Sequence, residues 1–113
     1  MISLPIFFEN SAVPKILSKV SPISIGAITV GPVVFCDGEI SESLKRHESI
    51  HWEQYKECLI IGFLLLYAFF WIRNLCKGMG GSDAYYNIPF EKEAYDNQEN
   101  ECYLLNRKRY SWV

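Results

Sequence analysis

The chain has 113 residues, which is enough for one domain with one modest hydrophobic core. Half of the residues are hydrophobic and 15% are aromatic, so a groove, a partner or a membrane surface is expected to cover part of the apolar surface. The formal net charge of −2 argues against a general nucleic-acid binder, and only Arg107-Lys108-Arg109 is locally basic.

Residues 1–22 mix prolines with large apolar residues. This composition predicts an irregular or short helical arm that packs onto the rest of the chain. The first basic side chain is Lys15, so no positive charge precedes the apolar residues and no signal peptide is expected. Residues 23–113 are predicted to form a single domain.

Residues 25–36 are rich in β-branched side chains and are interrupted by Gly31-Pro32. The pattern predicts two short strands, at about 25–30 and 32–36. Two arrangements remain open: a hairpin that turns at Gly31-Pro32, or a single bulged edge strand.

A long helical pattern begins at Ser41 or Ser43, both good N-cap residues, with Glu42 in the first turn. The pattern continues to about Cys76. Because such a helix would be unusually long for a small domain, Gly62 is expected to mark a bend or a break.

The second half of this pattern, residues 59–72, carries no charge and lies between Glu57 and Arg73. As a helix it would be about 21 Å long, short of the ~30 Å hydrocarbon core of a bilayer. We therefore favour a buried helix or a helix at a protein interface over membrane insertion, and we keep a membrane or protein partner through residues 59–72 as a possible role.

The glycine-rich segment 77–82 is expected to end this helix. Pro89 suits the first turn of a further helix, which is predicted to end near Leu105.

Four cysteines stand far apart, with no C-x-x-C pair: Cys36, Cys58, Cys76 and Cys102. The spacing argues against a zinc ribbon and against a thioredoxin-like redox pair. An even count permits two disulfides, but we expect free thiols in a reducing compartment.

The segment His47-Glu48-Ser49-Ile50-His51 reads H-E-x-x-H and contains both histidines of the chain. Positions i and i+4 of a helix lie on one face, so the two imidazoles can bind one tetrahedral metal ion. The intervening glutamate then lies beside a water in the open coordination position. The motif predicts a Zn²⁺ site with His47 and His51 as ligands and Glu48 as the general base.

A catalytic zinc usually has three protein ligands. Since the chain has no third histidine, the remaining ligand is expected to be a carboxylate. The segment 90–96 holds two candidates, Glu91 and Glu93, which are too far apart around a helix to face one ion together.

The combination of His47-Glu48-Ser49-Ile50-His51-Trp52 with the later Phe90-Glu91-Lys92-Glu93-Ala94 resembles the gluzincin group of zincin metallopeptidases. It is also similar to small bacterial and phage-encoded H-E-x-x-H proteins, in which the histidine helix continues into a hydrophobic segment. The resemblance covers residues 27–97. It implies an α+β, minimal zincin-like domain, with an N-terminal hairpin or edge strands, a long H-E-x-x-H helix and a C-terminal ligand-bearing helix.

The resemblance implies that Glu91, three residues before Ala94, is the third ligand, with Glu93 as the alternative. The family usually has an aspartate after the alanine, which supports a metal-bound histidine. This chain has Tyr95 there and Asp96 one place later.

The predicted function is therefore hydrolysis of peptide bonds in a protein or peptide substrate, with no role for nucleic acid. Tyr85, Tyr86 and Tyr95 are candidates to stabilise the oxyanion, although packing is their more common role. The strand region 28–35 could add an extended substrate as a further strand. Trp52 and Gln54 are expected to pack the helix rather than to contact substrate.

Two other functions remain open. The first is a non-catalytic structural or assembly protein, for example a component of a phage particle, whose metal site stabilises a small fold. The second is a peptidase that acts at a bilayer surface. A cytoplasmic or virion-associated location is favoured, and a membrane-associated location is the alternative.

Overall fold

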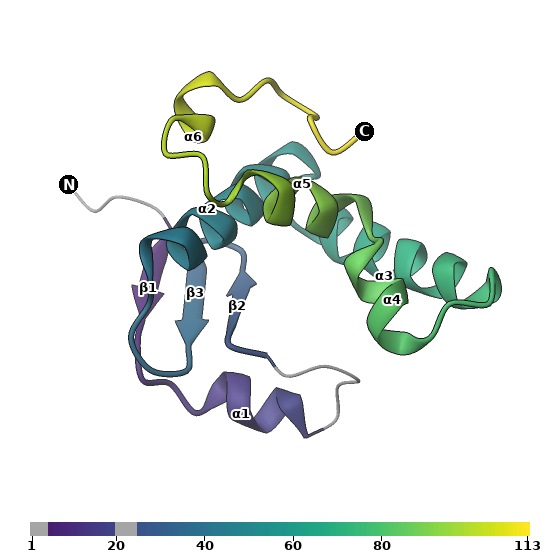
Figure 1. Cartoon of the computed structure of the whole chain (residues 1–113), viewed down its shortest axis with the longest axis horizontal. Coiled ribbons are helices and arrows are strands. Elements are labelled where there is room, and N and C mark those ends of the chain that lie inside the picture. The colour runs from purple at the N-terminus through teal and green to yellow at the C-terminus, as the bar shows by residue number, and fades with distance from the viewer. Residues whose placement is uncertain (1–4, 20–24) are drawn as a thin grey trace.

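The computed structural model describes residues 5–19 and 25–113, so parts of the predicted arm lie outside the described residues. Within these ranges the chain is a mixed α+β domain (Figure 1) with six helices and a three-stranded sheet. The elements are, in chain order, β1 (Ile6–Phe8), α1 (Val13–Ser18), β2 (Ala27–Val30), β3 (Val33–Cys36), α2 (Glu42–Glu57), α3 (Ile61–Cys76), α4 (Gly81–Tyr86), α5 (Pro89–Asn97) and α6 (Tyr103–Asn106).

The sheet has the strand order β1-β3-β2, in which β2 and β3 form an antiparallel hairpin and β1 is parallel to β3. The hairpin turns at Gly31-Pro32, as one of the two sequence alternatives predicted. Gly31 has φ of 59°, because a two-residue hairpin loop needs a positive φ. The sequence did not predict β1, whose three residues lie in the segment expected to be irregular or helical. As a result β3 is the central strand and β2 is an edge.

Helix α2 begins where the sequence predicted. Ser41 is the N-cap, and its hydroxyl accepts a hydrogen bond from the Leu44 backbone N–H at 3.1 Å. Helix α2 packs against β2, α3 and α5. Its buried residues form one helical face: His47, Glu48, Ile50, His51, Trp52, Gln54 and Tyr55.

The break between α2 and α3 lies at Cys58–Ile60, and Gly62 is inside α3, so the predicted break position was wrong. The Ile60 N–H donates to the Tyr55 carbonyl (2.7 Å) and the Leu59 N–H donates to the Lys56 carbonyl (3.4 Å). This is the Schellman pattern of a helix C-terminus, in which the C′ residue is usually glycine. Here Leu59 takes that position with φ of 58°. The two helices consequently meet at 109°.

Of the two arrangements that the sequence favoured for α3, a buried helix and a helix at a protein interface, the buried helix is not found, because only Phe63 and Asn74 among its residues are buried. Figure 1 shows α3 and α4 extending away from the sheet. Among the described residues, no single helix is long and apolar enough to cross a membrane; α2 and α3 meet that criterion only as a bent pair.

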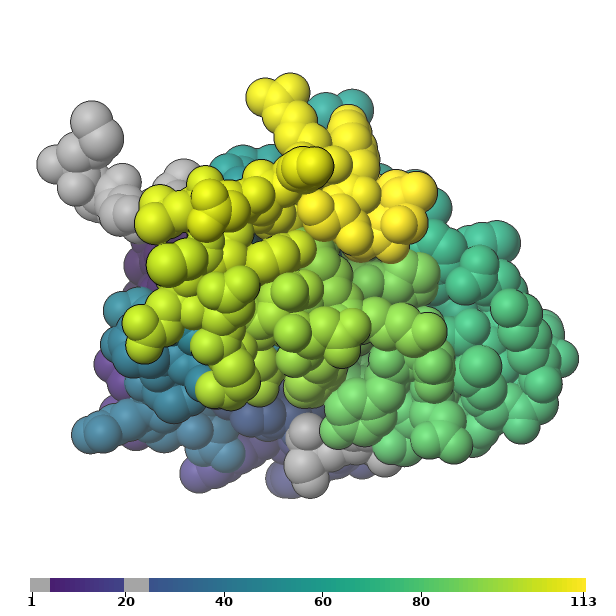
Figure 2. All heavy atoms as spheres, turned by 45° about the horizontal axis from the view of Figure 1, so that its top comes forward, coloured from purple at the N-terminus to yellow at the C-terminus, as the bar shows by residue number. Residues whose placement is uncertain are grey.

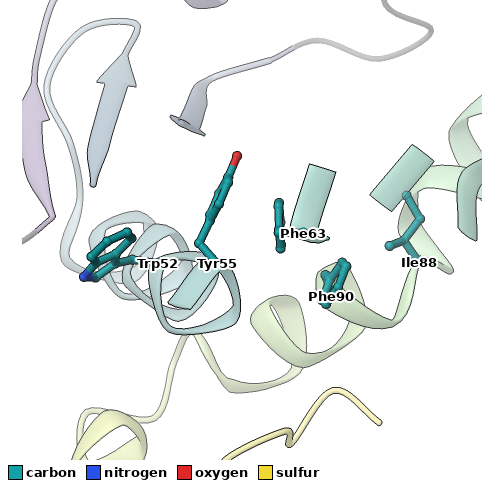
Figure 3. Close-up of a cluster of buried hydrophobic side chains, with 5 residues drawn as sticks. All are labelled: Trp52, Tyr55, Phe63, Ile88 and Phe90. Carbon is teal, nitrogen blue, oxygen red and sulfur yellow. The ribbon is translucent and has the colours of Figure 1, made fainter. Parts of the chain in front are cut away.

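The C-terminal part differs from the sequence prediction in two ways. A short helix, α4, forms directly after the glycine-rich segment, and α5 ends at Asn97 rather than near Leu105. Pro89 does open α5, as predicted. The main apolar cluster (Figure 3) is formed by residues of α2, of α3 and of the start of α5. It consists of Trp52, Tyr55, Phe63, Ile88 and Phe90. The four cysteines are free thiols.

The Leu59→Gly substitution is expected to raise the free energy of unfolding by about 1 kcal/mol, because a left-handed conformation strains residues with a Cβ and not glycine. Leu59 is 85% exposed, so little packing is lost. The control is Leu65→Gly, which removes an exposed leucine from the interior of α3 and is expected to cost about 1 kcal/mol. Urea unfolding followed by circular dichroism measures both. Equal destabilisation by the two changes would contradict the conformation assigned to Leu59.

Candidate metal centre

Helices α2 and α5 bring His47, His51 and Glu91 together, and this group can hold a metal ion. Both Nε2 atoms approach the same carboxylate oxygen, Glu91 Oε1, at 3.2 Å from His47 and 3.1 Å from His51. The two Nε2 atoms are 3.2 Å apart. The three donor atoms therefore form a compact triangle. All three residues are buried.

The amide of Gln54 sets the orientation of His51. Its Oε1 lies 2.7 Å from His51 Nδ1, and its Nε2 donates to the Phe90 carbonyl (3.0 Å) and to Glu93 Oε1 (2.9 Å). Because both partners of the amide nitrogen are acceptors, the amide oxygen must face the imidazole. His51 therefore carries its proton on Nδ1, and Nε2 is left as the metal-binding atom.

His47 is supported in the same way by residues that follow α5. Its Nδ1 lies 2.8 Å from Gln98 Oε1, and the Gln98 carbonyl accepts a hydrogen bond from Arg46. The Tyr95 ring packs edge-on against the imidazole, with centroids 4.4 Å apart. His47 is thus supported by Gln98, and Asp96, one place after the position at which the resembled family has its aspartate, is exposed.

Glu91 is held by a residue that the sequence did not single out. The Tyr67 hydroxyl of α3 donates to Glu91 Oε2 at 2.7 Å, which leaves Oε1 directed at the histidines. Burial opposes the ionisation of Glu91, but the neighbouring imidazoles hold the pKa of this carboxyl well below its usual range.

Burial also disfavours the charged form of His51, yet the Glu91 carboxylate offsets this and raises the pKa of His51 to about 9. When no metal is bound, the proton that His51 shares with Glu91 thus stabilises the close approach of the three donor atoms. A metal ion that binds here displaces that proton.

Glu93, the alternative ligand, points to the other side of α5 and lies outside the metal group. Its Oε2 accepts hydrogen bonds from Tyr103 and from Arg107 Nε, both at 2.6 Å. Arg107 also forms a two-bonded pair with Glu57 of α2 at 2.8 and 2.9 Å. Figure 2 shows the C-terminal segment lying over α5. Glu93 therefore links this segment to Gln54 and, through Gln54, to His51.

Glu48 is buried beside the triangle, and its Oε2 accepts a hydrogen bond from the Thr29 hydroxyl of β2. Thr29 is itself positioned by Tyr55, whose hydroxyl donates to the Thr29 carbonyl at 2.8 Å. The carboxylate of Glu48 is thus fixed between α2 and the edge strand.

An open pocket of about 620 Å³ is lined by the three candidate ligands, His47, His51 and Glu91, and by Glu48. One wall is β2 and the segment before it, and the opposite wall is α3. Tyr85 and Tyr95 line this pocket, with their hydroxyls 3.1 Å apart, but Tyr86 does not. Burial raises the pKa of Tyr85, and it raises the pKa of Tyr95 to about 12, so both side chains remain protonated donors at neutral pH.

The sequence reasoning missed Gln54 as a supporting residue, and it missed Gln98 and Tyr67. Gln54 lies three residues after His51, one helical turn away on the same face, and this spacing was the available signal. Gln98 and Tyr67 reach the site from other elements, so no local pattern marks them. The expectation that Trp52 packs the helix is confirmed, because Trp52 belongs to the apolar cluster.

Comparison with known proteins adds no relative: no family model, no curated protein and no solved structure matches this chain.

Substitution of the two glutamates separates the candidate ligands. Glu91→Gln is expected to weaken metal binding more than about 100-fold, because loss of a ligand costs more than loss of an outer partner, which is about 10–100-fold. Glu93→Gln should retain a stoichiometric ion, since Glu93 does not reach the triangle. Competitive titration with Zn²⁺ and a chromophoric chelator measures both affinities. The reverse order of the two affinities would make Glu93 the ligand.

The role of Gln54 can be measured separately. Gln54→Leu keeps the volume but removes the acceptor at His51 Nδ1, and the affinity for metal is expected to fall about 10–100-fold. The visible spectrum of the Co²⁺-loaded protein should change as well, because the imidazole is no longer held in one orientation. Glu53→Gln, the neighbouring residue that pairs with Lys56 at the surface, is the control. A folded Gln54→Leu protein with unchanged affinity and spectrum would refute this role.

Proposed function

We propose that this protein is a zinc-dependent metallopeptidase in which Glu48 is the general base. The observation that carries the proposal is that Glu48 and the group His47, His51 and Glu91 occupy one open pocket. A catalytic metal site needs protein ligands, a base and access for substrate, and this pocket combines the three.

The donor set supports zinc as the metal. Two imidazole nitrogens and one carboxylate oxygen form the two-His-one-Glu set of many catalytic zinc sites. In a tetrahedral site with bonds of about 2.0–2.1 Å, ligand atoms are about 3.3 Å apart. The separations here, 3.1–3.2 Å between the three donor atoms, agree with that spacing.

Zinc in this position would polarise the scissile carbonyl and lower the pKa of water. Glu48 accepts the proton of the attacking water and passes it to the leaving amine. The Thr29 hydroxyl fixes one carboxylate oxygen of Glu48, so the carboxylate is oriented before substrate arrives. Tyr85 and Tyr95, as protonated donors in the pocket, are the candidates to stabilise the oxyanion.

The edge strand β2 supports an extended peptide as the substrate. Gly26 accepts a hydrogen bond from Asp37 N–H, and in an antiparallel pair residues alternate between bonding the partner and pointing outward. The backbone groups of Ala27 and Thr29 therefore point away from β3, toward the side of β2 on which no further strand lies among residues 5–19 and 25–113. Tyr55 already occupies the Thr29 carbonyl, whereas both backbone groups of Ala27 have no partner in the part of the chain that the structure describes and can bond a peptide. Only β2, and not the whole predicted region 28–35, provides this edge, because β3 is central.

A structural role for the metal is the second candidate. The three ligands are buried and join α2 to α5, so an ion would stabilise a small domain without any reaction. An assembly protein, for example a particle component, would use the site in this way. Loss of folding on chelation with no hydrolysis of any substrate would favour this candidate.

The Glu48→Gln substitution tests catalysis directly. The amide oxygen of the new side chain can still accept from Thr29, so metal content and folding should be unchanged, whereas hydrolysis of unfolded casein or a peptide library should fall about 10²–10⁴-fold. Proteolysis assays on zinc-loaded protein, with Glu53→Gln as the control, provide the measurement. Unchanged hydrolysis by Glu48→Gln would remove Glu48 from the mechanism.

A further inference from the structure

The outer side of α3 is an apolar stripe. Its exposed residues follow helical spacing, and together with the preceding turn they form what we call the α3 apolar face: Leu59, Ile60, Ile61, Leu64, Leu65, Ala68, Phe69 and Ile72. Leu65 is 68% exposed and Phe69 is 57% exposed. A helix that is apolar on its solvent side as well as on its packed side is normally covered.

This face offers no hydrogen bonds to a partner. The polar atoms of the aromatic residues of α3 are used inside the protein: Tyr67 donates to Glu91, and Trp71 Nε1 donates to the Gly81 carbonyl at 3.2 Å. Asn74 is buried and donates to the Ala84 carbonyl. A protein interface usually contains about one hydrogen bond per 100–200 Å². A hydrocarbon surface requires none.

Along the chain, the α3 apolar face is followed by basic residues. Between Glu57 and Asp83 the only charged residues are Arg73 and Lys77, both at the C-terminal end of α3. The Arg73 guanidinium lies over the Phe70 ring, 4.8 Å from its centroid. Arg73 therefore lies on the side of α3 that packs against the apolar cluster, and the exposed cation at the end of the stripe is Lys77. An apolar stripe that ends in an exposed lysine has the charge that anionic lipid headgroups attract.

We propose that the α3 apolar face docks onto the surface of an anionic lipid bilayer. Helix α3 has 16 residues and is therefore about 24 Å long at 1.5 Å per residue. Because this is shorter than the ~30 Å hydrocarbon core, the helix lies along the bilayer surface and does not cross it. Its exposed leucines and phenylalanine enter the acyl region, while Lys77 stays at the level of the headgroups.

The docked orientation has a consequence for the pocket, which rests on the proposed function. Leu64 and Ala68 belong to the α3 apolar face and also line the pocket. The mouth of the pocket therefore opens beside the bilayer, and the substrates are apolar peptide segments at the lipid surface.

Vesicle flotation tests the docking. The wild-type protein should float with phosphatidylcholine vesicles that contain about one third phosphatidylglycerol, and should float less at high salt. The double substitution Leu65→Glu and Phe69→Glu should reduce binding more than about tenfold, because two apolar side chains are replaced by charges that repel the lipid. Lys77→Gln should weaken binding to the anionic vesicles and leave the weaker binding to pure phosphatidylcholine unchanged.

The matched control is Ile16→Glu with Leu105→Glu, which alters two exposed apolar residues on other elements and should leave binding unchanged. Circular dichroism and metal content establish that both double variants are folded. Glu48→Gln should float like the wild type, so failure of the peptidase proposal would not affect this result. Absence of flotation, or an equal loss in both double variants, would overturn the proposal. So would a dimer, detected by light scattering, that the α3 substitutions convert to a monomer, because a second copy would then cover the face.

Discussion

The hydrogen bonds of the buried Gln54 amide are the constraint on which the rest of the site depends. Its nitrogen donates to the Phe90 carbonyl and to Glu93, both on α5, while its oxygen faces His51 on its own helix. One side chain therefore fixes the distance between α2 and α5 and the tautomer of a candidate metal ligand, His51. If the amide were reversed, its N–H groups would face the Nδ1–H of His51, and its oxygen would face the Phe90 carbonyl and the Glu93 carboxylate. Each buried group left unpaired in this way costs about 1–3 kcal/mol. The site is preorganised because this side chain has only one satisfactory orientation.

The C-terminal segment continues the same network. Arg107 is almost completely buried between Glu57 and Glu93, so one cation neutralises two carboxylates from α2 and α5. An isolated charge in this place would be costly, whereas a guanidinium with five donors can satisfy both partners at once. Trp112 adds a hydrogen bond to Glu57 and packs against Phe90 in a tilted arrangement, which anchors the end of the chain to the apolar cluster. The residues after α5 thus support the candidate metal centre in two ways: Gln98 contacts His47 directly, whereas Arg107 and Trp112 act through Glu57, Glu93 and the apolar cluster.

Local signals in the sequence were sufficient for the start of α2 and for the spacing of His47 and His51, because an N-cap and an i, i+4 pair each depend on neighbouring residues. The same kind of signal placed a turn at Gly31-Pro32 but left a hairpin and a bulged edge strand as alternatives. The preference for Glu91 came from the resemblance of the F-E-x-E-A segment, and the structure places this residue with the histidines. Gln98, Tyr67 and Arg107 could not be predicted, since their partners lie on other elements. A break was expected in the long helical pattern, but it was placed at Gly62 because a leucine in a glycine position leaves no sequence signal. The exposure of α3 could not be decided from the sequence, because a core helix and a helix at an interface can have the same apolar composition.

The strained turn at Leu59 connects the metal centre to the proposed lipid face. The Schellman hydrogen bonds at Tyr55 and Lys56 end α2 abruptly and send α3 away at 109°, so that α3 is free of the sheet on its outer side. On its inner side, Phe63 stacks on Tyr55 and Tyr67 holds Glu91. A straight continuation of α2 would have carried Tyr67 past the ligand that it orients. The geometry that exposes the apolar residues is therefore the same geometry that completes the site, and for this reason a surface bound by α3 would lie next to the pocket.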